Sequence, residues 1–443
     1  MALTKPGSDR EPLLTAHNAY TASEEQHDES SGLSTKHEGT YPDGSWQSWA
    51  VVLGSFCSFF SGLGMVNSLG AYQSYIATHQ LQHESNTRVG FIFSLHTMLI
   101  FSAGLFFDPL FDRDGPRPLA ATGAALSLVS YISLGFCTSY WHFLVSIGVI
   151  GGLSGALLFT CALSTIPHWF LRRRSLAMSL AISGGSFGGI VFPMILGQFL
   201  PKLGLTWTTR VIALTMLPSH IIAILLLKSR FSSPNHETCW PDLSILFIPR
   251  TSSVAVALLL VELSLYIPVA SVTSFATAQG HPPEVAYRLL TYLSLGSLAG
   301  RWLPAFLGDR LGPMNMLPLT LCTCIIALLG FWLPAGPSMP MTITFVLLYG
   351  LGSGSYISLT PVCIGQLCET QRYGRYSSTL YMFSSLGSLV GIPIGAYVLE
   401  STHNSFQSLA VFVACVCAMA LSLLLVARVI FGMHDKSSKV TEE

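Results

Sequence analysis

The sequence predicts an all-α membrane protein with twelve transmembrane helices in two six-helix halves. Of its 443 residues, 51% are hydrophobic and only 10% are charged, whereas roughly 25% of residues are charged in a typical soluble protein. The charged turn at 112–116 (DRDGP) recurs at 309–313 (DRLGP), and each copy lies between two long apolar runs. Two similar halves in a membrane protein are typical of a transporter whose substrate site lies between them.

Twelve apolar runs, each long enough to cross about 30 Å of hydrocarbon, give the predicted spans. The first six cover residues 46–69, 88–107, 118–137, 142–166, 175–199 and 207–228. The second six cover residues 251–277, 286–307, 315–334, 341–366, 376–399 and 407–431. The predicted halves are therefore 46–228 and 251–431, and the polar, proline-containing segment 229–250 is expected to be a cytosolic linker.

Both ends of the chain are expected to be cytosolic tails. Residues 1–45 are rich in Ser, Thr, Glu and His and lack the apolar core of a signal peptide, which predicts a disordered tail, and 432–443 form the second tail. Lys and Arg resist translocation, and in this topology most of them lie on the side of the two termini: Arg113, Arg117, Arg172, Arg173, Arg174, Lys228, Arg230, Arg310, Arg372, Arg375, Arg428 and Lys436. The opposite loops hold few cations: Arg88, Lys202, Arg210 and Arg288.

Other chemistries find no support in the sequence. The ten cysteines lie mostly inside apolar runs, without a CxxC pair or a metal-ligand spacing, and are interpreted as core residues. The pattern GxSxG at 184–188 lies within a predicted span, and no nucleotide-binding motif occurs. We therefore expect no enzyme activity, no cofactor and no metal, so that solute gradients drive transport. The net charge of +0 suggests no nucleic-acid partner.

Small residues recur at helical spacing in spans 4, 5, 8, 10 and 11, as at Gly184/Gly188 and Gly350/Gly354. Such faces let helices approach closely, which matters in lipid because no hydrophobic effect drives helices together there. They predict tight helix contacts, and smooth faces of this kind would also let the two halves rock against each other.

Several longer motifs, in order, resemble the monocarboxylate-porter family of the major facilitator superfamily, particularly its fungal branch. They are DGSWQSW at 43–49, DPLFDRDGPRP at 108–118, RRRSLA at 172–177 and GGIVFP at 188–193. The resemblance covers about residues 43–431 and implies the major facilitator fold and secondary transport. Proton-coupled members carry a Lys in span 1 and an Asp and Arg pair in span 8. By spacing, these positions hold Asn67, Ser297 and Arg301 here.

Ionisable side chains inside the apolar runs are the first candidates for substrate binding or coupling. A charge in hydrocarbon costs at least about 2.5–3.5 kcal/mol, so it is kept for a reason. Glu262 in span 7 and Arg301 in span 8 lie at similar depths, at 1.5 Å per residue. They are expected to bind substrate or couple transport, or to form a structural pair with each other.

Polar residues in the spans that line the cavity of this superfamily are further candidates. Tyr266 lies one turn from Glu262, and Thr273 lies about two turns beyond Tyr266. The remaining candidates in spans 1, 4 and 10 are Asn67, Thr160, Tyr356 and Thr360. His96 and His220 could relay protons, although a hydrogen-bonded neutral histidine is the more common outcome.

The paired charges Asp112/Arg113 and Asp309/Arg310 are interpreted as gating elements. Charges at helix ends can stabilise one conformation and separate in the other, as alternating access requires; simple anchoring of the loop is the alternative.

The expected function is secondary active or facilitative transport of a small organic solute, either an organic acid or a fungal metabolite, by a monomer in the plasma membrane. Import and export, and proton coupling and facilitated diffusion, remain open. A nutrient sensor without significant flux is the alternative function. The vacuolar membrane is the alternative compartment, because DREPLL at 9–14 resembles an acidic dileucine signal.

Overall fold

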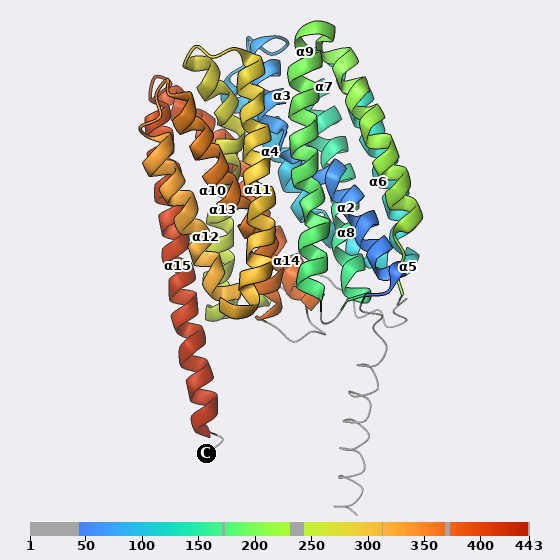
Figure 1. Ribbon diagram of the computed structural model, residues 1–443, viewed down its shortest axis with the longest axis vertical. Coiled ribbons are helices and arrows are strands. Elements are labelled where there is room, and N and C mark those ends of the chain that lie inside the picture. Colours follow the sequence, from blue (N-terminus) through green and yellow to red (C-terminus); the bar gives the residue numbers. More distant parts are fainter. Residues whose placement is uncertain (1–43, 171–172, 231–242, 312, 368–372, 442–443) are drawn as a thin grey trace, which may run out of the picture.

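The computed structural model describes residues 44–441 apart from 171–172, 231–242, 312 and 368–372, and the described residues form helices and short connections without a strand (Figure 1). Eight of their helical segments are long and apolar enough to cross a membrane by length and composition alone. One of these segments contains two predicted spans. The helices form a bundle of two six-helix halves, as the sequence predicts.

The first half contains the six spans expected before the linker. Its elements are α2 (Trp46–Val66), α3 (Leu69–Thr78), α4 (Asn86–Ser102), α5 (Gly104–Asp114), α6 (Pro116–Leu134), α7 (Tyr140–Phe143), the π-helix η1 (Leu144–Gly151), α8 (Gly152–Thr165), the 3₁₀-helix η2 (Ile166–His168) and α9 (Arg174–Leu226). The long α9 supplies spans 5 and 6, because it reverses at Gly204, where φ is 68°. Glycine adopts this left-handed conformation without steric cost.

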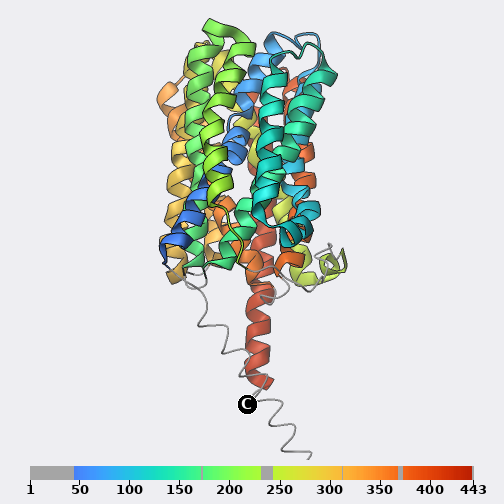
Figure 2. The same cartoon turned by 90° about the vertical axis from the view of Figure 1, so that its right-hand side faces the viewer.

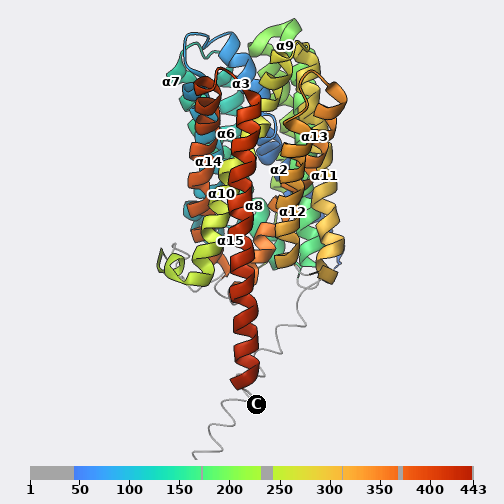
Figure 3. The same cartoon turned by 90° about the vertical axis from the view of Figure 1, so that its left-hand side faces the viewer.

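The second half repeats this pattern. Its elements are the 3₁₀-helix η3 (Leu243–Phe247), α10 (Pro249–Ala278), α11 (Pro283–Leu311), α12 (Pro313–Ala327), the π-helix η4 (Leu328–Trp332), α13 (Met339–Gly365), α14 (Tyr373–Ser401) and α15 (Phe406–Thr441). α15 packs against α10 and α12 and extends past the bundle at the end that also holds the start of α2 (Figure 3). We call this end the terminal end and the other the opposite end.

Several predicted boundaries were wrong. Span 1 does not end at residue 69, because the chain breaks at Asn67 and continues as α3 to Thr78. The charged segments at 112–114 and 309–310 are not turns, since they form the last turns of α5 and α11. The reversal after α5 takes place at Gly115, where φ is 79°. Apolar runs mark the hydrocarbon-crossing part of a helix and miss its polar ends.

Glycines allow close helix contacts within each half. In the first half, a Cβ atom at Gly188 of α9 would overlap the Phe60 carbonyl oxygen and Gly64 Cα of α2. In the second half, a Cβ atom at Gly350 of α13 would overlap the Leu293 carbonyl oxygen of α11. The helix contacts predicted from the small-residue faces are therefore confirmed at these positions.

The two halves meet mainly along three helix pairs. α4 packs against α14, α9 against α11, and α3 against α10, so that each pair takes one helix from each half. The first half faces the viewer in Figure 2, and the second half faces the viewer in Figure 3. A site between the halves must therefore lie inside the bundle, among these pairs.

Candidate functional site

A small cavity, which we call the central cavity, lies among helices of both halves. Its volume of about 10 Å³ leaves room for roughly one water molecule. The first half contributes α4, α8 and α9, and the second half contributes α10, α13 and α14. The lining residues are Phe101, Phe159, Leu163, Ile182, Glu262, Tyr356, Ile357, Thr360, Pro361 and Tyr381. Three of the predicted site residues, Glu262, Tyr356 and Thr360, therefore meet at one place.

Glu262 is the one carboxylate among the described residues that line the central cavity, and no Lys, Arg or His lines it. Its side chain is buried, with 4% exposed, and Oε2 has no hydrogen-bond partner. Buried charges in proteins are normally paired, because an isolated carboxylate loses its hydration without compensation. The carboxyl group of Glu262 is thus placed to receive a proton or a ligand.

Arg301 lies outside the central cavity, between α11 and α9. Its side chain is buried, and Nη1 donates a hydrogen bond to the carbonyl oxygen of Ile182 in α9. Nε has no partner. One turn away, Ser186 Oγ donates to Ser297 Oγ at 3.2 Å. Arg301 and Ser297 therefore join the second half to the first.

The structure does not form the ion pair between Glu262 and Arg301 that similar depth suggested. The ion pairs Arg88–Glu84 and Arg113–Asp114 involve neither residue. Depth along a helix axis fixes only one coordinate of a side chain, and its rotation about the axis decides which neighbour it faces. In this conformation Arg301 faces α9, whereas Glu262 faces the central cavity.

The other polar candidates mostly bond to backbone. Asn67 Nδ2 donates to the Gly185 carbonyl oxygen at 3.1 Å, within the first half. Thr273 Oγ1 donates to the Gly70 carbonyl oxygen at 3.0 Å and joins α10 to α3. Thr360 Oγ1 donates within its own helix at 2.9 Å. Thr160 is buried in α8.

Both intramembrane histidines are hydrogen-bonded. His96 Nδ1 lies 2.8 Å from the Ile147 carbonyl oxygen in the π-helix η1. Because a carbonyl only accepts, Nδ1 carries the proton in the neutral ring. His220 Nδ1 lies 3.5 Å from Ser61 Oγ. The two Nε2 atoms are buried without a partner among the described residues.

The predicted gating residues are only partly described. Arg113 forms a two-point contact with the neighbouring Asp114, at 2.9 Å and 2.8 Å. Hydrogen bonding to the Arg113 guanidinium lowers the pKa of the Asp114 carboxyl below its usual value. The side chains of Asp112, Asp309 and Arg310 lie outside the part of the chain that the structure describes, so their gating role stays a prediction.

Sequence reasoning missed three aromatic side chains of the central cavity, those of Phe101, Phe159 and Tyr381. Phe101 and Tyr381 stack with centroids 6.3 Å apart and planes 13° apart. Phe159 meets Phe101 edge-on at 5.4 Å, and Tyr266 lies 6.5 Å from Phe101. Phe101 and Phe159 belong to the first half, and Tyr266 and Tyr381 belong to the second. The chain contains 26 Phe and 15 Tyr, so composition alone could not single these out.

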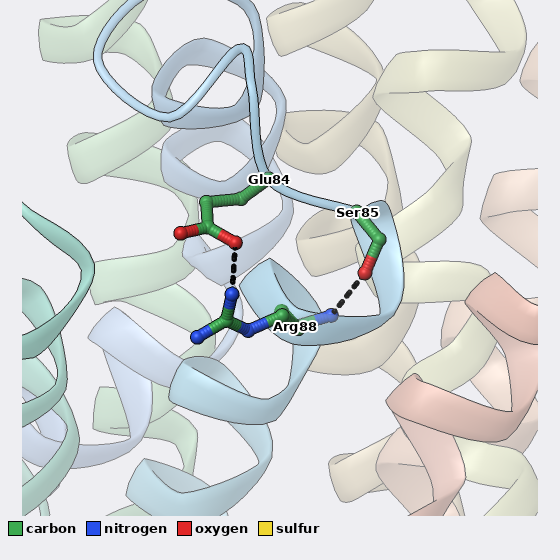
Figure 4. Close-up of polar contacts among 3 residues, drawn as sticks. All are labelled: Glu84, Ser85 and Arg88. Carbon is green, nitrogen blue, oxygen red and sulfur yellow. Dashed lines mark hydrogen bonds and ion pairs between the residues drawn. The ribbon is translucent and has the colours of Figure 1, made fainter.

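A direct contact joins the halves at the opposite end of the bundle. Glu400, near the end of α14, accepts hydrogen bonds from Thr87 N at 3.2 Å and Thr87 Oγ1 at 3.0 Å. Figure 4 shows the other polar contacts at the N-terminus of α4, where Ser85 Oγ accepts from Arg88 N and Glu84 pairs with the Arg88 guanidinium at 2.5 Å. A carboxylate at a helix N-terminus is favourable. Glu400 therefore holds α4 to α14 in this conformation.

Glu400→Gln is expected to loosen this end of the bundle, because it removes the charge from two hydrogen bonds. Hydrogen bonds to charged groups contribute about 1.5–3 kcal/mol when made, and exposure reduces this value. In purified protein, a Gln73→Cys thiol close to the α4–α14 contact should react several-fold faster with a polar thiol reagent. Glu84→Gln is the matched control, since Glu84 pairs within the first half. Equal rates in the two variants would show that Glu400 does not restrain the halves.

A larger cavity of about 480 Å³ lies between α9 and α11 at the opposite end of the bundle. It is lined by Pro193, Met194, Gly197, Gln198, Pro201, Lys202, Glu284, Arg288, Thr291 and Tyr292. No predicted substrate or coupling residue lines it, and it involves one helix from each half. The central cavity, which draws on six helices, is therefore the stronger candidate site. Among the described residues, no group of three His, Cys, Asp or Glu could hold a metal ion.

Comparisons with known proteins agree with this architecture. The family described as Major Facilitator Superfamily matches residues 54–391. The riboflavin transporter MCH5 of Saccharomyces cerevisiae is 30% identical over 408 residues, which cover 85% of this chain and 78% of that protein. The fujikurins efflux protein of Gibberella fujikuroi is 28% identical over 433 residues, which cover 97% of this chain and 91% of that protein.

A solved structure shows the same fold. The crystal structure of the nucleoside transporter NupG superposes with a TM-score of 0.68 and covers 85% of this chain and 99% of that one. At 13% sequence identity, this likeness concerns the fold alone.

Proposed function

We propose that this chain, which belongs to the Major Facilitator Superfamily, transports a small organic solute across a membrane by alternating access. The observation that carries the proposal is Glu262, an unpaired buried carboxyl group that faces a cavity between the two halves. An ionisable group at this depth marks a functional site by default. A cavity that holds about one water molecule corresponds to a closed site, which opens when the halves move apart.

Export of a fungal secondary metabolite is the more specific proposal. The similarity to a protein described as a fujikurins efflux protein extends over nearly the whole chain and supports it. The riboflavin transporter, which carries a large heterocycle, supports a solute bigger than a simple short-chain acid. The resemblance of the motifs at 43–49 and 108–118 to those of monocarboxylate porters supports membership of that branch.

The proposed location is the plasma membrane, with both termini in the cytosol. The distribution of Lys and Arg supports this orientation, since they gather on the terminal side. In this orientation Arg113 lies at the cytosolic end, and the Glu400–Thr87 contact closes the extracellular end. The vacuolar membrane is the other proposed compartment.

Comparison of metabolites inside and outside cells with and without the protein would identify the solute. A compound that accumulates inside cells lacking the protein is the expected result for an exporter. Counterflow of that labelled compound into proteoliposomes preloaded with the unlabelled compound, which needs no imposed ion gradient, then tests transport directly. Binding of the compound without counterflow would contradict transport and would identify the protein as a sensor on a transporter fold.

A further inference from the structure

The rings around the central cavity form a layer that spans the boundary between the halves. Phe101 and Tyr381 lie on opposite sides of this boundary, on α4 and α14, with planes only 13° apart. Phe159 meets both rings edge-on, at 5.4 Å and 6.4 Å. Separation of the halves would therefore expose two nearly parallel aromatic faces with a third ring closing one side. A flat aromatic molecule fits between such faces, because stacked and edge-on contacts are the favoured ring geometries.

The carboxylate of Glu262, which lines the same cavity, is a hydrogen-bond acceptor. Glu262 has an unpartnered Oε2, and no cation among the described residues lines the cavity. Arg301 does not line the cavity, and its Nη1 donates to the carbonyl oxygen of Ile182, one of the lining residues. A carboxylate ligand would meet another carboxylate here and no positive charge among the described lining residues, which is unfavourable in a medium of low polarity.

We propose that the substrate is a flat aromatic molecule that bears a protonated amine or another N–H donor, held by stacking between Phe101 and Tyr381 and by a hydrogen bond to Glu262. This inference rests on the proposed transport function and names the chemistry of its substrate. It excludes simple monocarboxylates, although the sequence motifs resemble those of carboxylate porters. The ligand then supplies the hydrogen-bond donor that Glu262 lacks, and the bond between them is charge-assisted.

Three probes separate the two parts of this proposal. Naphthalen-2-ylmethylamine carries an aromatic ring and a cation, 2-naphthoate carries the same ring and a carboxylate, and decahydronaphthalen-2-ylmethylamine carries the cation without an aromatic ring. Binding to the purified full-length protein is measured by calorimetry. The aromatic amine should bind at least about tenfold more tightly than either of the other probes.

Variants assign these preferences to residues. Glu262→Gln, which keeps the shape of the side chain, should remove the preference for amine over carboxylate. Phe101→Leu or Tyr381→Leu should remove the preference for the aromatic over the saturated amine. Phe187→Leu is the matched control, because Phe187 pairs with Phe56 on a half-exposed face of α9 away from the cavity, and it should change neither preference. Melting temperature and monodispersity show that each variant is folded.

The two proposals can fail separately. Tighter binding of 2-naphthoate, an unchanged preference in Glu262→Gln, or no binding of the aromatic amine at about 1 mM would overturn the substrate class. Flux is read independently, from uptake of the labelled aromatic amine into proteoliposomes and from counterflow of the cellular compound. Preferential binding without any flux would support the substrate class and contradict transport, whereas counterflow of an aliphatic carboxylate would support transport and contradict the substrate class.

Discussion

Gly188→Leu, on the α2–α9 contact, is expected to cause a large loss of folded protein. A Cβ atom at this position would already overlap the Phe60 carbonyl oxygen and Gly64 Cα, and both are backbone atoms that cannot rotate away. Overpacking of this kind costs about 1–3 kcal/mol or more, and changes of 1–2 kcal/mol alter cellular abundance several-fold. We therefore expect a several-fold lower abundance at the membrane, together with a lower melting temperature.

Gly330→Leu is the matched control for this substitution. Gly330 lies on the exposed face of η4, and a Cβ atom there would meet nothing within 4 Å. The same change in volume should leave abundance and melting temperature close to those of the wild type. If the two variants were equally abundant, close packing of α2 on α9 would not limit assembly.

The positions of the spans could be predicted from the sequence, because a helix that crosses lipid must be apolar over nearly its full length. The predicted runs 207–228 and 251–277, for example, correspond to the second part of α9 and to most of α10. Their polar ends could not be predicted in the same way, since hydropathy falls where a helix leaves the hydrocarbon. This is why 112–114 looked like a turn although it is the last turn of α5.

The candidate site could be predicted in part. Glu262, Tyr356 and Thr360 were found because charge and polarity stand out in an apolar span, and the structure places all three on the central cavity. Phe101 and Tyr381 give no such signal, since aromatic rings are ordinary residues in membrane helices. The two stacked residues are far apart in the sequence, one in each half, and only the packing of α4 against α14 brings their rings together.

The positions that depart from the carboxylate-porter pattern have structural roles here. Asn67 bonds to the backbone of α9, and Ser297 accepts from Ser186 across the halves. Neither side chain could carry the charge of the Lys or Asp that it replaces. A proton-coupling mechanism that depends on those charges cannot operate through these two residues, and the buried carboxyl of Glu262 is the remaining candidate in the cavity.

Arg301→Gln is expected to abolish most transport while leaving the protein as stable as the wild type or more so. Arg301 is buried with one hydrogen bond to a backbone carbonyl and an Nε without a partner, and no ion pair compensates its charge. Replacing such a charge by a neutral side chain removes a desolvation cost. A residue that lowers stability is retained for function. The function of Arg301 is expected to be conformational, because it joins α11 to α9 at a contact between the halves that alternating access must change.

The expected signature is therefore a fall of more than about tenfold in maximal transport rate, with a much smaller change in substrate affinity, because Arg301 does not line the central cavity. Arg301→Lys should recover part of the rate, since it keeps the charge but loses the planar fork. Arg428→Gln, an exposed arginine on α15, is the control and should transport normally. A large loss of affinity in Arg301→Gln would instead show that Arg301 contacts the substrate once the halves separate, as an anion site requires. Full activity would show that the cation has no part in transport.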